Sequence, residues 1–448
     1  MYAPQFGHSN QLVALRNAAA WASILNRTLV LPHLTSHTGG KPLAAFGAAF
    51  DVARGAAAAL PLSLLELDDY KRLGLPPPAR HLVLDTNTRF AVADDAYLAA
   101  VGLAAPPLHV PLRTFSVAAI ADAFGGCRQT TLSFRSLFAA FDHKPLSASP
   151  PGWSVGGRPG LDWLDRALLP ALLAPAPPLL ALVDAIELAV LQKAGGSEAD
   201  TAAAVAAAAP SLENIEDPRC KDDNPSCAAW AVDGQCKSNP KYMLVSCARA
   251  CGACTPTVAV APGVQLACAH LRRGDFVEEC QKYDGEAKSG AARGWVLSHL
   301  RGGWSCLQTP AEAALNLVDL QAKARPATLA VYAAVEEPAA LRAPELANLT
   351  LSSLADHTAL VDAADLGMPA DLATTLLDQL VCARARTLLL NIYSTFSQLV
   401  MSQIGMRRGG LGFVRDLDHT QQRVAGVRLT YWRRPNPFAL EKLLAGAS

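Results

Sequence analysis

The chain has 448 residues, 51% of them hydrophobic, and its formal net charge is zero. A chain of this length usually forms two or three domains, each large enough to bury its own core. Zero net charge excludes a general electrostatic attraction to nucleic acids or to anionic membranes, so any phosphate binding has to be local.

Residues 1–170 are predicted to form a first α/β domain. A loop at 6–8 precedes a helical pattern over 11–25 and an apolar strand at 28–32, and further strands are predicted at 81–84 and 108–112. Loop, helix and strand in this order suit a βαβ unit whose first strand is mostly missing. We therefore expect a longer natural chain, with a signal peptide or a membrane anchor upstream of Met1.

Residues 171–217 are predicted to form a helical, low-complexity linker. The apolar run 161–191 contains acidic residues and prolines, so we expect packed helices there rather than a membrane span. Residues 257–448 are predicted to form a second α/β domain. Its expected strands are 264–270, 328–334 and 387–392, and its expected helices cover 371–386 and begin again near 394–397.

Six of the 11 cysteines lie between Cys220 and Cys254, in a module that we place at 218–256. Such density is typical of disulfide-bonded proteins outside the cytosol, so we expect residence in the lumen of the endoplasmic reticulum or Golgi, or secretion. Spacing alone leaves the pairing open. A zinc site at Cys251 and Cys254 is the weaker alternative, because no histidine lies in the module. Outside it, we expect Cys280 to pair with Cys306.

The module resembles ShK-type domains in its cysteine spacing and in the segments Ala229-Trp-Ala231, Asn239-Pro240 and Tyr242-Met243. The resemblance implies the pairs Cys220–Cys254, Cys227–Cys247 and Cys236–Cys251. Lys241 and Tyr242 align with the Lys-Tyr pair of channel-blocking ShK toxins. Because that pair lies in an otherwise ordinary module pattern, we expect a small interaction or spacer module, and we suggest that it holds or presents an acceptor.

Three separated segments carry residues suited to binding a sugar nucleotide: Tyr2-Ala-Pro-Gln-Phe-Gly-His-Ser-Asn-Gln11, His270-Leu-Arg-Arg-Gly-Asp-Phe276 and Asn391-Ile-Tyr-Ser-Thr-Phe-Ser397. The second and third follow predicted strands, and ligands favour the carboxyl ends of parallel strands. The planar guanidinium of Arg272 suits a diphosphate, and hydroxyl and N–H groups at 394–396 suit its oxygens. Such groups stabilise a departing diphosphate without a metal.

Together the three segments resemble GDP-fucose-dependent protein O-fucosyltransferases, and the middle one also resembles α1,6-fucosyltransferases. The resemblance implies two Rossmann-like domains in the GT-B arrangement. It also implies inverting, metal-independent transfer of fucose from GDP-fucose to a protein Ser/Thr or glycan hydroxyl, with no cofactor besides the donor. The implied donor-binding residues are Gly7, His270, Arg272, Asp275, Phe276, Ser394, Thr395 and Phe396, and Asn10 would face the fucose and the acceptor.

The first loop departs from the family pattern, because it has no arginine and no acidic residue occurs before Asp51. General base catalysis needs a group within hydrogen-bond reach of the acceptor hydroxyl. His8 is the candidate base, beside Arg272 and Asn10 in the expected catalytic set. The alternative is an SN1-like route in which the leaving phosphate takes the proton. Glu336 stands where the family has an aspartate, which leaves the role of that position open.

Two other functions remain open. The first is a secreted, non-catalytic glycan- or protein-binding protein with a degenerate transferase fold. The second is an oxidoreductase, which is disfavoured because no Gly-x-Gly-x-x-Gly follows a predicted strand. The Asp-x-Asp at Asp416 and Asp418 is interpreted as surface charge.

The sequence contains two N-glycosylation sequons, at Asn26 and at Asn348. Asn26 belongs to the helix-to-strand segment of the family resemblance, where a buried and unmodified side chain is expected. Asn348 is therefore the predicted glycosylation site.

Overall fold

The computed structural model describes the greater part of both predicted α/β regions. The described residues are 1–4, 7–35, 41–58, 62–84, 91–112, 116–135, 137, 168–195, 264–271, 277–278, 280–282, 307–335, 338–347, 349–391, 394–408, 423–424, 427–432 and scattered positions within 224–247. The predicted domain limits at 217 and 256 lie outside these residues, and the limit at 170 falls within a helix. The domain limits therefore stay predictions.

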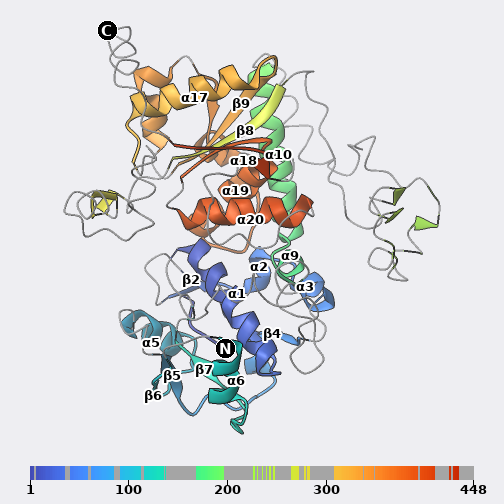
Figure 1. The fold of residues 1–448 in the computed structure, drawn as a ribbon, viewed down its shortest axis with the longest axis vertical. Coiled ribbons are helices and arrows are strands. Elements are labelled where there is room, and N and C mark those ends of the chain that lie inside the picture. Colours follow the sequence, from blue (N-terminus) through green and yellow to red (C-terminus); the bar gives the residue numbers. More distant parts are fainter. Residues whose placement is uncertain are drawn as a thin grey trace.

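The N-terminal half is built on short parallel strands (Figure 1). β1 (Leu29–Leu31) pairs with β4 (Leu64–Glu66), and β5 (His81–Leu84) pairs with β6 (Pro107–Val110) and β7 (Ser133–Phe134). Tyr2 forms a parallel bridge to Phe134, so the first residues lie beside β7. The remaining elements of this half are β2 (Leu34–Thr35), β3 (Pro42–Ala44), α1 (His8–Ile24), α2 (Phe46–Ala49), α3 (Val52–Ala58), α4 (Leu67–Arg72), α5 (Ala91–Ala100) and α6 (Val117–Phe124).

The predicted linker contains two helices that pack into the core. α9 (Leu169–Leu172) contacts α3, and the long α10 (Pro177–Gly195) packs against β8, β9 and α19 of the C-terminal half. Arg384 of α19 forms ion pairs with Asp184 and Glu187 of α10. α10 is therefore an integral element of the second α/β unit, whereas α9 also contacts α3 of the first half.

The C-terminal half is a six-stranded sheet of order β10-β9-β8-β11-β13-β12, in which only the edge strand β12 runs antiparallel. Alternate residues of β8 and β9 bury against α17 on one face and against α10, α19 and α20 on the other. Helices on both faces are what a largely parallel sheet of this kind requires. The strands are β8 (Val264–Leu271), β9 (Thr328–Val335), β10 (Leu351–Ser352), β11 (Thr387–Leu390), β12 (Arg423–Val424) and β13 (Val427–Tyr431). The helices are α17 (Pro310–Ala324), η3 (Pro338–Arg342), η4 (Pro344–Leu346), η5 (Leu354–His357), α18 (Thr358–Ala363), α19 (Ala370–Arg384) and α20 (Thr395–Arg408).

The two halves meet where α1 packs against α19 and α20 (Figure 1). One continuous hydrophobic cluster runs from Trp21 of α1 through α9 and α10 to Leu399 of α20. At the same seam, Gln379 Nε2 of α19 donates to Ser9 Oγ of α1 over 2.8 Å. The α/β class with parallel sheets is thus confirmed, and the halves share a core at this seam. Among the described residues, no helix has the length and apolarity needed to cross a membrane.

The described disulfides confirm one predicted pair and include one that was not predicted. Cys227 pairs with Cys247 as predicted, and Cys280 is disulfide-bonded, although its predicted partner Cys306 lies outside the described residues. A further bond, Cys268–Cys382, joins the centre of β8 to α19, and both cysteines are fully buried. The predicted pairs Cys220–Cys254 and Cys236–Cys251 also lie outside the described residues. Cys127 is free.

Replacing Cys268 and Cys382 together with alanine is expected to lower the free energy of unfolding by roughly 4–5 kcal/mol, because the bond closes a long loop in the unfolded chain. Urea denaturation at 25 °C measures the difference. Cys127→Ala, which removes a free thiol, is the control. A double variant within about 1 kcal/mol of the wild type would show that the bond adds little to the free energy of unfolding.

The core also contains a buried carboxyl group at Asp378 of α19. Tyr332 Oη of β9 donates to Asp378 Oδ1 over 2.6 Å, and burial raises the pKa of Asp378 to about 7 despite this hydrogen bond. The folded state therefore binds the proton more tightly than the unfolded state does. The stability that this group contributes is complete below pH ~4 and is lost as the pH rises to about 7.

Asp378→Asn is expected to remove this pH dependence. Relative to the wild type, the variant should gain stability between pH 4 and pH 7, by up to roughly 4 kcal/mol. Chemical denaturation at a series of pH values measures the change, with Asp371→Asn at an exposed position of the same helix as the control. Parallel curves for Asp378→Asn and the wild type would contradict the assignment.

Candidate functional site

His270 lies at the carboxyl end of β8 and is held from two directions. Its ring stacks on Phe396 of α20, with centroids 4.2 Å apart and planes 24° from parallel. Its Nδ1 lies 2.8 Å from Ser397 Oγ, which also accepts a hydrogen bond from the N–H of Asn391 over 3.1 Å. Because β8 and β11 are parallel neighbours, their carboxyl ends and the start of α20 meet here. The structure thus brings together His270 and Phe396, two of the predicted donor-binding residues.

The Ser394 hydroxyl at the start of α20 already has a backbone partner. Ser394 Oγ accepts from the N–H of Phe396 over 3.3 Å, as an N-terminal capping residue does, and Ser394 is buried. Thr395 is half-buried at the first position of the helix. A phosphate at this end of the helix would therefore rely on backbone N–H groups and the helix dipole more than on the Ser394 hydroxyl.

Trp432 makes a third contact with His270, and this residue was not predicted from the sequence. The residue follows β13, its backbone N–H donates to Leu390 O over 3.1 Å, and its indole Nε1 donates to His270 O over 2.8 Å. The side chain is 1% exposed. In the sequence, an aromatic residue directly after a strand gives little indication of a contact with His270. The contact arises because β8, β11 and β13 are neighbours in the sheet.

The first predicted segment lies at the N-terminus of α1. Gly7 precedes the helix, and Gln11 clamps β2 through Nε2 to Thr35 O (2.8 Å) and Oε1 from Thr35 N (3.0 Å). Asn10 is half-buried, and in the described part of the chain its Oδ1 has no hydrogen-bond partner. Of the motif residues at 9–11, Ser9 and Gln11 are therefore tied into the fold, whereas the buried Asn10 Oδ1 has no partner among the described residues.

His8 lies in an apolar setting. Its ring stacks on Phe50 at 6.0 Å, and neither ring nitrogen has a hydrogen-bond partner among the described residues. Burial lowers the pKa of His8 to about 3. The ring is therefore neutral above that pH, and among the described residues neither nitrogen has a hydrogen-bond partner that would hold a proton on it. Its role as a base stays a prediction, and this environment argues against it.

A second histidine, His33, has a carboxylate beside its ring, which suits proton transfer better than the setting of His8. His33 follows β1, and its Nε2 lies 3.0 Å from Asp68 Oδ2 on the first turn of α4, which follows β4. The hydroxyl of Tyr97 donates to His33 O over 3.3 Å. Sequence reasoning missed this pair, because its partners lie 35 residues apart and meet only through the pairing of β1 with β4.

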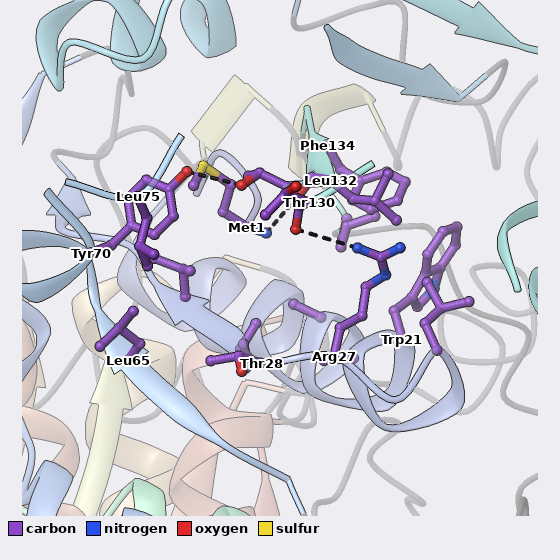
Figure 2. Close-up of a pocket in the computed structure, with 17 residues that line it drawn as sticks. Met1, Trp21, Arg27, Thr28, Leu65, Tyr70, Leu75, Thr130, Leu132 and Phe134 are labelled. Carbon is purple, nitrogen blue, oxygen red and sulfur yellow. Dashed lines mark hydrogen bonds between the residues drawn. The ribbon is translucent and has the colours of Figure 1, made fainter. Parts of the chain in front are cut away.

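A cavity of about 260 Å³ lies at the opposite end of α1 (Figure 2). Arg27 stands at one side of it and donates to backbone carbonyls of 127–130, while the N-terminal amine of Met1 donates to Leu132 O. None of the predicted site residues contributes to its wall. Among the described residues, no group of three or more His, Cys, Asp or Glu side chains is arranged to hold a metal ion.

Comparison with known proteins assigns the cysteine-rich region. Residues 219–254 match the family model described as ShK domain-like. These residues form an ShK module. The putative tyrosinase-like protein tyr-3 of Caenorhabditis elegans is 34% identical over 74 residues, which cover 15% of this chain and 11% of that protein. The chain thus spans about a tenth of the length of that curated relative.

Solved fucosyltransferase structures show a likeness over most of the chain. POFUT1 in complex with GDP-fucose matches at 12% identity with a TM-score of 0.48, covering 96% of this chain and 97% of that one. POFUT1 in complex with GDP matches at 12% identity with a TM-score of 0.44, covering 96% and 97%. The fucosyltransferase NodZ from Bradyrhizobium matches at 10% identity with a TM-score of 0.36, covering 89% and 91%.

Within the ShK module, the described residues centre on the Cys227–Cys247 bond. Cys227, Met243 and Cys247 are buried together, with Trp230 packed against them. Tyr242 is exposed, and its ring meets Trp230 edge-on at 6.2 Å. The module has its own small apolar centre, as a disulfide-stapled unit requires.

Several predicted site residues lie outside the described part of the chain, namely Arg272, Asp275, Phe276, Glu336, Asn348, Asp416 and Asp418. Their roles stay predictions. The expectation that Asn26 is buried is wrong, because both Asn26 and Thr28 are exposed. α1 ends at Ile24, and the chain reverses through Asn26 at a φ of 53°, a left-handed conformation that asparagine tolerates at a surface turn.

Trp432→Phe keeps an aromatic ring but removes the donor to His270 O. We expect a loss of about 1 kcal/mol in the free energy of unfolding and faster amide hydrogen exchange at the carboxyl end of β8. Hydrogen exchange followed by mass spectrometry on peptides covering 264–271 measures this. Trp230→Phe, the same exchange in the ShK module, should leave β8 unaffected. Unchanged exchange in Trp432→Phe would mean that the indole does not fix this segment.

Proposed function

We propose that the protein is an inverting, metal-independent glycosyltransferase that moves fucose from GDP-fucose to a protein Ser/Thr or glycan hydroxyl. The observation that carries the proposal is the fixed position of His270. It stands at the carboxyl end of a buried parallel strand, stacked on Phe396 at the start of α20. Sheets of this type bind nucleotides at that edge, and a helix N-terminus beside it favours a diphosphate.

The described residues have distinct parts in this proposal. Trp432, Ser397 and Phe396 fix His270, which lies two residues before Arg272 in the sequence. The guanidinium of Arg272 would neutralise the charge that develops on the β-phosphate as the bond to the sugar breaks. The acceptor hydroxyl would attack the anomeric carbon from the opposite face, which inverts its configuration. Asn10, at the seam between the halves, would bind the sugar or the acceptor.

The oxidised cysteines support a luminal or extracellular site of action. Cys268–Cys382 is buried in the second α/β unit and Cys227–Cys247 in the ShK module, and such bonds are typical of secretory compartments. We propose the endoplasmic reticulum or Golgi lumen, with GDP-fucose as the donor and no further cofactor. The ShK module would hold or present the acceptor.

The proposal is tested by calorimetry with GDP, GDP-fucose and UDP, followed by a screen of sugar nucleotides for nucleotide release. We expect selective binding of the guanine nucleotides and release of GDP from GDP-fucose. Nucleotide binding without turnover under every acceptor condition would favour the non-catalytic alternative. Absence of binding would reject the donor site.

Arg272→Ala is expected to weaken GDP binding about 10- to 100-fold, because a charged hydrogen-bond donor to the diphosphate is lost. Transfer should fall further, since the charge on the leaving group grows in the transition state. Arg386→Ala, at an exposed arginine just before β11, is the matched control. Undiminished binding and turnover in Arg272→Ala would refute the phosphate role.

A further inference from the structure

His33 and Asp68 form a polar pair at the carboxyl edge of the first parallel strand pair. Leu31 of β1 lies in register with Glu66 of β4, so the residues that follow the two strands emerge side by side. His33 Nε2 and Asp68 Oδ2 are 3.0 Å apart, and the two side chains are 20% and 61% exposed. The pair is therefore accessible to a ligand and is not part of the packed core.

The fold connects this pair to the seam between the halves. His33 directly precedes β2, and Thr35 of β2 is held by both ends of the Gln11 amide. Gln11 follows Asn10 at the start of α1, where α1 meets α19 and α20. In Figure 1, β2 lies beside the end of α1 that points toward α20. His33 and Asn10 thus approach the same side of the N-terminal half.

We propose that His33 is the general base of the transfer reaction and that Asp68 orients it. The proposal rests on the function proposed above. With its Nε2–H donated to Asp68, the neutral ring presents Nδ1 as the acceptor. Nδ1 takes the proton of the acceptor hydroxyl as that oxygen bonds to the anomeric carbon. The bond from that carbon to the β-phosphate oxygen breaks, and its electron pair leaves with GDP. The Asp68 carboxylate stabilises the imidazolium.

The surroundings distinguish His33 from His8, the base expected from the sequence. His8 is buried beside Phe50, without a partner for either nitrogen among the described residues. Among the described residues, the groups on elements next to His33 are Asp68 on α4, Tyr97 on α5 and Glu66 at the end of β4, whose Oε1 accepts from Gly47 N. Of these, Asp68 is the one that contacts the ring, so the polarising carboxylate that a histidine base needs is present.

The test compares GDP-fucose hydrolysis, with water as the acceptor, in the wild type and in His33→Gln, and measures the dissociation constant of GDP in both. We expect the turnover number to fall about 100-fold or more in His33→Gln while GDP affinity stays within about twofold. The acidic limb of the pH–rate profile should disappear in this variant. Asp68→Asn should slow turnover less and keep that limb. Imidazole added to His33→Ala should restore part of the rate.

Matched controls are His109→Gln, at an exposed position of β6, and Asp69→Asn, the neighbouring carboxylate on α4, which pairs with Arg72. Both should behave as the wild type does. Normal turnover in His33→Gln, or a parallel loss of GDP binding, would overturn the base assignment. A wild-type protein that binds no GDP would instead overturn the proposed function, so the two failures are distinguishable.

Discussion

The burial of β8 on both faces and along both edges is the constraint on which the C-terminal site depends. β9 and β11 pair with its two edges, α17 covers one face, and α10 and α19 cover the other. The Cys268–Cys382 bond then links the middle of the strand to α19. A strand fixed in this way delivers His270 to a set position, and the contacts from Trp432, Ser397 and Phe396 need only orient its last residues.

The same helix that β8 is bonded to also reaches the N-terminal half. α19 carries Cys382, Asp378 and Gln379 within one turn, and these three contact β8, β9 and α1 respectively. Because the hydrophobic cluster is continuous from α1 to α20, relative rotation of the halves would have to break packed apolar contacts. We therefore expect the halves to keep their arrangement at this seam when a ligand binds, with adjustments confined to the segments that follow the strands.

Local patterns in the sequence predicted much of this fold. Apolar spacing located α1, β1, β5, β8, β9, α19 and β11 to within a few residues, because each has a periodicity of its own. The Cys227–Cys247 pair was predicted because the resemblance to ShK domains implied it. By contrast, Cys268–Cys382, Trp432 with His270, and His33 with Asp68 depend on which strands are neighbours. Residues 114 or 162 positions apart carry no local signal of their contact.

His8 and His33 show that residue type and sequence position do not by themselves indicate which histidine is suited to act as a base. His8 lies inside the motif that resembles the transferase family, yet burial lowers its pKa to about 3. His33 lies outside that motif, yet the β1–β4 pairing places a carboxylate beside its ring and leaves part of the ring accessible. Desolvation disfavours the charged imidazolium in the first setting, whereas in the second a carboxylate oxygen lies 3.0 Å from the ring. Proton transfer requires the charged form to exist for part of the reaction, so the environment, and not the motif, determines which ring is suited to it.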